Sequence, residues 1–197
     1  DLTFRGKVDL DFSGSSIENF SGTTRISLAE LAKNGSPLPF DSLIITSSGA
    51  GKNRKLIVES NEFKAEVAGD YNVKDLPDAF AYLLNKYYPS FVKAPVKISP
   101  TLDINFDIRT FYVDEYLHLI DSSLSGFNNS HFSGSLNLAK NELGFTASVP
   151  QFKYKQYNFD EVKLTANGDI DKLLVTGEAK NIHINDSLSV PKAVFKI

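Results

Sequence analysis

The chain has 197 residues, of which 42% are hydrophobic and 23% are charged, and its formal net charge at pH 7 is −3. This composition is that of a globular protein and not of a disordered one, and it lacks the excess of basic residues that nucleic-acid binding requires. The absence of cysteine excludes disulfides, thiol catalysis and thiolate metal sites. Since the sequence begins with Asp1 and contains no methionine, we expect it to be a piece of a longer protein.

The first third of the chain predicts a series of strands. Residues 1–12 alternate between apolar and polar positions, residues 22–28 form a second alternating segment, and residues 40–71 hold three more. The alternation is most regular over residues 63–69. A period of two residues predicts a sheet with one apolar face and one polar face.

At residue 75 the apolar period lengthens and predicts an amphipathic helix over residues 75–88. Pro89 predicts the end of this helix, because proline disfavours the helical conformation in the residue before it. A strand is predicted over residues 102–109, with a short helix after it at 113–120. From Phe132 onward the pattern predicts one strand after another.

Three short motifs recur in the same order in the two halves of the chain. Residues 20–23, 40–43 and 55–58 are similar to residues 132–135, 159–162 and 172–175. This common order predicts a repeated supersecondary unit and an elongated, stacked architecture. We therefore predict one continuous elongated sheet with four parts: a repeat unit at 1–74, a helical insertion at 75–92, a strand and short helix at 93–131, and a second repeat unit at 132–197.

The predicted strands place many apolar side chains on one face, and something must cover that face. Burying one such side chain contributes roughly 1.5–3 kcal/mol, so leaving about thirty in water would cost more than the ~5–15 kcal/mol net stability of a domain. Two short helices are too small to cover about eleven strands. The sheet therefore closes on itself as a sandwich or barrel, which is the ordinary solution, or curls into a trough that holds an apolar ligand.

No motif in the sequence indicates catalysis. The three histidines have no partner at the spacing of metal ligands, and the glycine-rich segment 49–52 lacks the flanking residues of a phosphate-binding loop. Asp103 and Asp107 share a strand face, as acidic residues on a solvated strand commonly do, and there is no Gly-x-Ser-x-Gly motif. We therefore predict no enzymatic activity, no cofactor and no metal site.

The order of several segments resembles that of a known family. The segments are residues 20–23, 40–48, 54–60, 63–71, 75–77 and 83–89, with 132–138 and 159–164 in the second half. Together they resemble the TamB (AsmA-like) family, and most closely its large Bacteroidetes branch. The resemblance covers most of the chain, but it rests on patterned strands and one helix–Tyr–Pro segment.

This resemblance implies an internal or C-terminal-half piece of a long periplasmic protein that is anchored in the inner membrane and reaches the outer membrane. The implied fold is mainly β, a long curved antiparallel sheet that forms a U-shaped trough with an apolar interior, plus one or two short helices. The implied function is phospholipid transfer between the two membranes, outer-membrane protein assembly, or both. The implied partners are phospholipid or another acyl-chain ligand, an outer-membrane barrel of the TamA/BamA type and the remainder of its own chain.

Two alternatives to a lipid-carrying trough stay open at this point. One is a non-catalytic β-sandwich that serves as a binding or scaffold module, in which the same apolar residues form a closed core. The other is an assembly factor that shares the trough but holds unfolded strands at its open edge by backbone pairing. The helix at 75–88 departs from a pure trough, so it either plugs or caps the groove or shields one edge of the sheet.

The residues expected to line the groove all fall on the apolar strand faces. They are Phe4, Val8, Leu10, Phe12, Leu43, Ile45, Leu56, Val58, Phe63, Val67, Ile104, Phe106, Ile108, Phe145, Val149, Val162, Leu164 and Val175. The Asp-Ser-Leu sequences at 41–43 and 186–188 also resemble the acceptor pattern for O-glycosylation in Bacteroidetes, which makes Ser42 and Ser187 candidate acceptors.

Overall fold

The computed structural model describes residues 2–15, 20–33, 36–87, 93–95, 101–169, 171–185 and 187–197. Its strands are β1 (Leu2–Ser13), β2 (Ser21–Lys33), β3 (Ser36–Ser48), β4 (Arg54–Glu59), β5 (Phe63–Asp70), β6 (Asp103–Thr110), β7 (Leu124–Gly126), β8 (His131–Asn137), β9 (Glu142–Tyr154), β10 (Tyr157–Asp169), β11 (Leu173–Asn185) and β12 (Leu188–Lys196). The α-helices are α1 (Leu76–Tyr87) and α2 (Asp114–Ile120), and short 3₁₀ turns span Gly51–Asn53 and Val73–Asp75. The predicted helices at 75–88 and 113–120 therefore form within one residue of their predicted ends.

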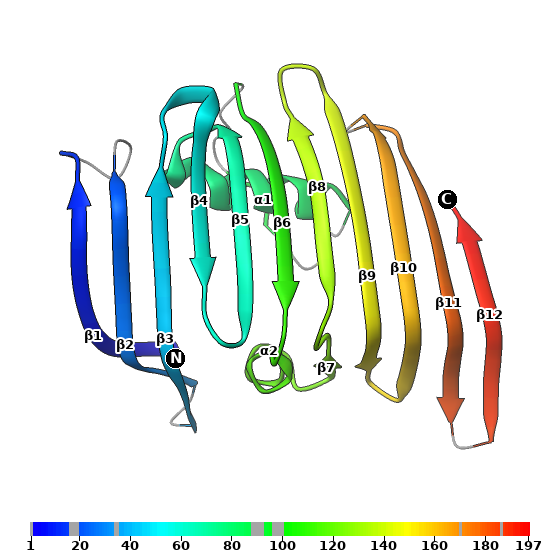
Figure 1. Cartoon of the computed structure of the whole chain (residues 1–197). Helices are drawn as coiled ribbons and strands as arrows, with labels where there is room; N and C mark the ends of the chain where they lie inside the picture. Colours follow the sequence, from blue (N-terminus) through cyan, green and yellow to red (C-terminus); the bar gives the residue numbers. More distant parts are fainter. Residues whose placement is uncertain are drawn as a thin grey trace.

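The twelve strands belong to one antiparallel sheet, in which the order in space follows the order in the chain (Figure 1). Only β7 leaves this path, and it pairs with the end of β9. β1 and β12 are the two edges, and within the described residues each pairs with a neighbour on one side only. The predicted curved antiparallel sheet is thus confirmed, and the described chain forms neither a sandwich nor a closed barrel.

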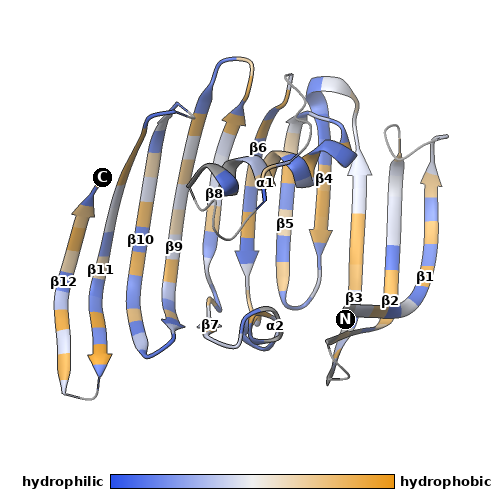
Figure 2. Cartoon of the chain, turned by 180° about the vertical axis from the view of Figure 1, so that it is seen from behind, coloured by the Kyte–Doolittle hydropathy of each residue, from blue (hydrophilic) through white to orange (hydrophobic). Residues whose placement is uncertain are grey.

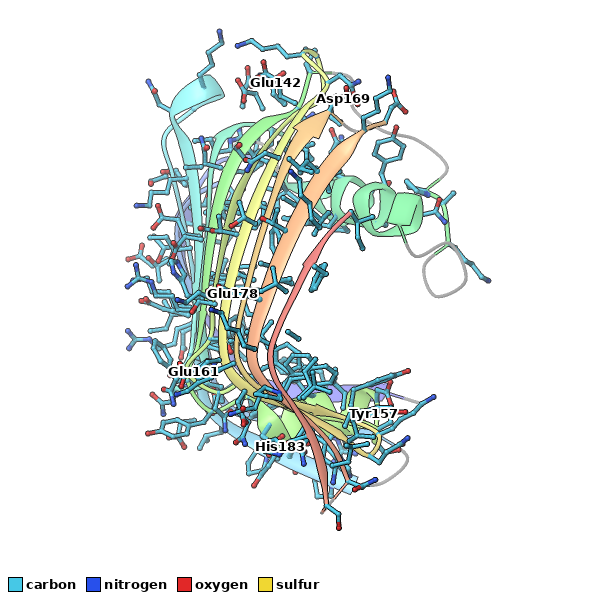
Figure 3. All side chains as sticks on the ribbon, turned by 90° about the vertical axis from the view of Figure 1, so that its right-hand side faces the viewer. Glu142, Tyr157, Glu161, Asp169, Glu178 and His183 are labelled. Carbon is cyan, nitrogen blue, oxygen red and sulfur yellow. The ribbon has the colours of Figure 1, made fainter. Side chains whose placement is uncertain are left out.

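The sheet bends sharply along a line that crosses the strands, and we call this line the crease (Figure 3). Leu28 in β2, Glu161 in β10 and Lys192 in β12 lie on the crease with φ angles of 50°, 47° and 53°. Their strands' registers place Glu161 opposite Lys180, which lies opposite Lys192. A positive φ is uncommon in residues other than glycine, and here it turns the strand and reverses the side to which alternate side chains point.

The crease divides the molecule into a tall wall and a shorter shelf that face each other across the concave side (Figure 3). β1–β3 and β9–β12 continue past the crease into the shelf, whereas β6 and β8 lie on the wall. Between β6 and β8 the chain forms α2 and β7, which complete the shelf (Figure 1). The Asn128 side-chain oxygen accepts hydrogen bonds from the backbone nitrogens of Val113 and Asp114 and so holds the start of α2.

α1 lies across the concave side of the wall, in front of the central strands when the molecule is seen from behind (Figure 2). Its residues Leu76 and Ala79 are buried in a core with the neighbouring Tyr71 and with sheet residues that include Ile104 and Leu136. The helix therefore covers part of the apolar face, and it does not shield an edge strand. Of the two interpretations left open by the sequence, the cap is the one observed.

The convex side of the sheet is the polar face that the alternation predicts. Cross-strand ion pairs join Lys55 to Glu66 at 2.8 Å and Lys163 to Glu178 at 3.5 Å, and Lys180 pairs with Glu161 at the crease. Figure 3 shows Glu178 and Glu161 on the outside of the curve. Because these pairs are solvated, each contributes little to stability. Together they make the convex face polar and exposed to solvent.

The internal motif matches fall on strands in two different ways. Residues 40–43 and 159–162 lie in β3 and β10, which run in the same direction. Residues 55–58 and 173–175 lie in β4 and β11, which also run in the same direction as each other. Residues 21–23 and 132–135 lie in β2 and β8, which run in opposite directions in this antiparallel sheet. The first match therefore does not relate equivalent strands.

Candidate functional site

The candidate site is the concave face of the sheet, and the cross-strand registers show which side chains share it. Starting from β5, Val67 lies opposite Phe106, which lies opposite Gly134, which lies opposite Phe145. Phe80 of α1 contacts Phe106 edge-on, with ring centroids 5.7 Å apart, so this row is on the side that α1 covers. Extending the registers to both edges places all eighteen predicted groove residues on this one face.

These residues differ greatly in their exposure to solvent. Ile104 is completely buried and Phe106 is 9% exposed, because α1 packs over them. On β1 the equivalent positions are open, and Phe4 and Leu10 are 48% and 59% exposed. The apolar face is therefore sealed beneath α1, at its centre, and open at its N-terminal edge.

The C-terminal edge of the concave face is also apolar and open. Val190 and Phe195 of β12 are more than 40% exposed, and Phe195 lies opposite Gly177 of β11 on the concave side. Neither residue was predicted to line the groove. The cross-strand register identifies them. Lys192 lies between Val190 and Phe195 and has a positive φ, so both residues face inward although they are five positions apart and strict alternation would place them on opposite faces.

A row of stacked phenylalanines lies on the concave face where the wall meets the shelf. Phe152 and Phe159 stack with centroids 4.5 Å apart and ring planes 6° from parallel. Phe127 lies 4.8 Å from Phe152 and 6.4 Å from Phe132. All four rings are partly buried and pack against the buried side chains of Val149, Val162 and Ala179.

This aromatic row was absent from the predicted lining for the same physical reason as the β12 residues. Strict alternation from Val149 predicts that Phe152 points to the convex side, and the same holds for Phe159 relative to Val162. β10 turns between these residues at Glu161, which has a positive φ, and all four side chains pack in one cluster on the concave side. A spacing of three between apolar residues on two neighbouring strands is the sequence signal of such a bend.

The concave face carries few polar groups, and those with assigned partners are satisfied within the protein. The hydroxyl of the buried Ser47 donates to the backbone oxygen of Phe20 at 2.9 Å. The Tyr71 hydroxyl donates a hydrogen bond to the backbone oxygen of Val67 at 3.2 Å. Burial raises the pKa of Tyr71 to about 12, although the nearby charge of Arg54 opposes this shift. Both groups therefore serve the packing of the face.

Two histidine–carboxylate pairs lie on the convex side. The ring Nε2 of His131 lies 2.6 Å from the Asp107 carboxylate, and Arg109 Nε lies 3.1 Å from its other oxygen. The hydrogen bond with His131 is the main cause that holds the pKa of Asp107 below its usual value. His183 forms a similar pair with Asp160 at 2.9 Å. Among the described residues no group of three or more candidate ligands could hold a metal ion.

A cavity of about 450 Å³ lies between the shelf segment of β3, the turn after β4 and α2. Tyr116 crosses it and hydrogen bonds to the backbone oxygen of Pro39 at 3.1 Å and to Glu62 at 3.2 Å. Burial is the main cause that raises the pKa of Tyr116, and the charge of Glu62 adds to it. These contacts tie α2 to two other parts of the sheet.

The two candidate glycosylation sites have different surroundings. Ser42 is partly buried in the middle of β3, opposite Ser27 of β2. Ser187 is exposed in the turn between β11 and β12, where the Asn185 side-chain oxygen accepts hydrogen bonds from the backbone of Ser187 and Leu188. Asp186 of this motif lies outside the described residues. Glycosylation stays a prediction, and Ser187 is the more accessible acceptor.

No helix in the described part of the chain has the length and apolar character needed to cross a lipid bilayer. Comparison of the chain with protein-family models, with curated proteins and with solved structures gives no match.

Proposed function

We propose that this chain is a non-catalytic, lipid-binding segment of a longer TamB-like protein in the periplasm. Its trough holds the acyl chains of phospholipid on their way between the inner membrane, where the parent chain is anchored, and the outer membrane, where it meets a barrel of the TamA/BamA type. The observation that supports this proposal is the concave face, which is apolar from β1 to β12 and is covered by α1 only at its centre.

The exposed part of this face is large enough to favour a ligand. Four inward-facing residues of β1 and several of β12 are about half exposed to water. Covering the remaining half of each such side chain with hydrocarbon would contribute on the order of 1 kcal/mol. Contiguous apolar surface of this kind marks a binding site in soluble proteins.

The chemistry of the lining favours hydrocarbon over peptide. A bound peptide strand brings backbone N–H and C=O groups that need partners. On the wall, the backbone groups of the inner strands β4, β5, β6 and β8 are already used in the ladders on both sides. An acyl chain has no such groups, so it can lie on the face without leaving any hydrogen bond unmade.

A photo-crosslinking experiment in cells tests this proposal. A photoreactive residue at Leu10, which is open on the concave side of β1, should capture phospholipid. The matched control is Asp9, the next residue on the same strand, which points to the convex side. Adducts with protein alone at Leu10, or equal lipid capture at both positions, would contradict the proposal. Phe106 is a poor position for this experiment because α1 covers it.

Outer-membrane protein assembly is the second candidate function, and the edge strands favour it. Within the described residues, β1 and β12 each leave one side of the backbone unpaired, and such an edge can pair with an added strand. A photoreactive residue at the exposed Val194 of β12 should then crosslink to newly made barrel protein. Lipid capture at Leu10 without protein capture at Val194 would favour lipid transfer alone.

A further inference from the structure

We infer that α1 divides the concave face into two tiers and that acyl chains bind only in the lower tier, along the crease and across the strands. This inference rests on the proposed function and names the path of the ligand within the trough. The upper tier is the part of the wall beneath α1 and includes Leu102, Ile104, Phe106, Leu136 and Leu143. The lower tier lies nearer the crease and includes Phe63, Ile108, Phe132, Phe152 and Phe159.

The upper tier has no free surface for a ligand. Ile104 is fully buried, Leu102 and Leu136 are 1% exposed, and the core that holds them also contains Leu76 and Ala79 at the start of α1. Phe80 closes this tier toward the crease by its edge-on contact with Phe106. A ligand could enter only by displacing α1, which would expose Ile104, Leu102 and Leu136, the largest apolar side chains that are fully buried among the described residues.

The lower tier is apolar but only partly covered. Ala65 lies opposite Ile108, and Ile108 lies opposite Phe132, so the row crosses β5, β6 and β8 without interruption. The row then continues through the stacked rings of Phe152 and Phe159 to β10. Every one of these five side chains is partly exposed, although each lies on the concave side.

The extent of the exposed apolar surface along the strands and across them indicates how an acyl chain would lie. Along a strand, the accessible apolar surface is limited by α1 at one end. At the other end it stops at the outer end of the shelf, where Figure 3 shows Tyr157. Across the strands, each neighbour adds another apolar side chain at about 4.8 Å intervals. An unbranched hydrocarbon chain fits this long, narrow surface, and its polar headgroup would face the open side between α1 and the shelf.

Tryptophan scanning can test this inference, because the chain contains no native tryptophan. A single tryptophan would replace Phe132 or Phe159 in the lower tier, or Phe106 or Phe80 at the α1 contact. The probe is phosphatidylcholine with brominated acyl chains, which quenches tryptophan at close range, and unbrominated phosphatidylcholine is the control. Circular dichroism and urea unfolding select the variants that retain the native sheet. Two positions in the lower tier and two at the α1 contact allow for one of each that does not fold.

We expect strong quenching of Phe132→Trp and Phe159→Trp and little quenching of Phe106→Trp and Phe80→Trp. Equal or stronger quenching at the α1 contact would overturn the two-tier path and leave lipid binding in place. Quenching at none of the four positions would overturn lipid binding as well. A further variant, Tyr157→Trp at the outer end of the shelf, detects adsorption of lipid to the surface, and quenching there alone would also overturn the inference.

Discussion

The centre of the concave face and its N-terminal edge share one sequence pattern and have opposite environments. β6 alternates Ile104, Phe106 and Ile108 with polar residues, and β1 alternates Val8 and Leu10 with polar residues in the same way. Ile104 is fully buried, whereas Leu10 is 59% exposed. The difference comes from α1, which packs over β6 and does not reach β1 (Figure 2).

This comparison shows that an apolar strand face is not by itself a core. In β6 and its neighbours the inward side chains stabilise the fold, since they lose water by packing against a helix. In β1 the same kind of side chain keeps much of its contact with water, and the proposed function depends on this exposed apolar surface. One continuous surface thus contains a buried core at its centre and exposed apolar side chains at its edge.

The strongest test of the comparison places a charge at each location. Ile104→Asp should abolish cooperative folding or lower the unfolding free energy by more than about 4 kcal/mol, because it buries an unpaired carboxylate. Leu10→Asp should cost less than about 1 kcal/mol, because that side chain is already solvated. Urea unfolding followed by circular dichroism measures both. Comparable losses would show that β1 is covered in solution and that the comparison is wrong.

A smaller effect is expected from loosening the helix. Phe80→Ala removes the edge-on contact with Phe106 and should lower the unfolding free energy by about 2–3 kcal/mol, since the ring is only partly buried. Phe4→Ala, at the open edge, is the matched control and should lose less than half of that. Urea unfolding again provides the measurement. If the two losses are equal, α1 does not stabilise the centre of the sheet.

A substitution at the crease between the wall and the shelf is expected to raise the free energy of unfolding. Leu28 is 83% exposed and has a φ of 50°, a conformation that costs about 1–2 kcal/mol for a residue with a β-carbon. Leu28→Gly should therefore raise the unfolding free energy by about 0.5 kcal/mol after the entropy cost of glycine. Ile26→Gly in the same strand should lower it. A loss at Leu28 as well would show that the bend does not depend on this backbone conformation.

The smallest effect concerns the convex face, where solvent is present throughout. The pKa of Asp107 is held below its unfolded value, so this carboxylate stabilises the native state above about pH 4 and loses that contribution as the pH falls through its lowered folded pKa. Because the side chain is 41% exposed, we expect a contribution of a few tenths of a kcal/mol. The stability difference between the native chain and Asp107→Asn should therefore be greater at pH 6 than at pH 2.5. A difference that is constant with pH would exclude this contribution.

The sequence predicted the elements with good accuracy because their signals are local. The change of period at residue 75 identified α1, and Pro89 placed its end close to Tyr87. Alternation identified the strands, and it assigned the eighteen predicted lining residues to a single face. It was less reliable across the crease, where the strands bend near Glu161 and Phe152 and Phe159 lie on the inward side.

By itself the amino-acid sequence determined a sheet with one apolar face and two short helices, since each of these depends on residue type and spacing. Only the tertiary structure decided that the sheet stays open, where it bends, and that α1 seals its centre and leaves its edges exposed. These features depend on backbone conformation at a few positions and on contacts between residues far apart in the chain, such as Phe80 with Phe106, which periodicity does not encode.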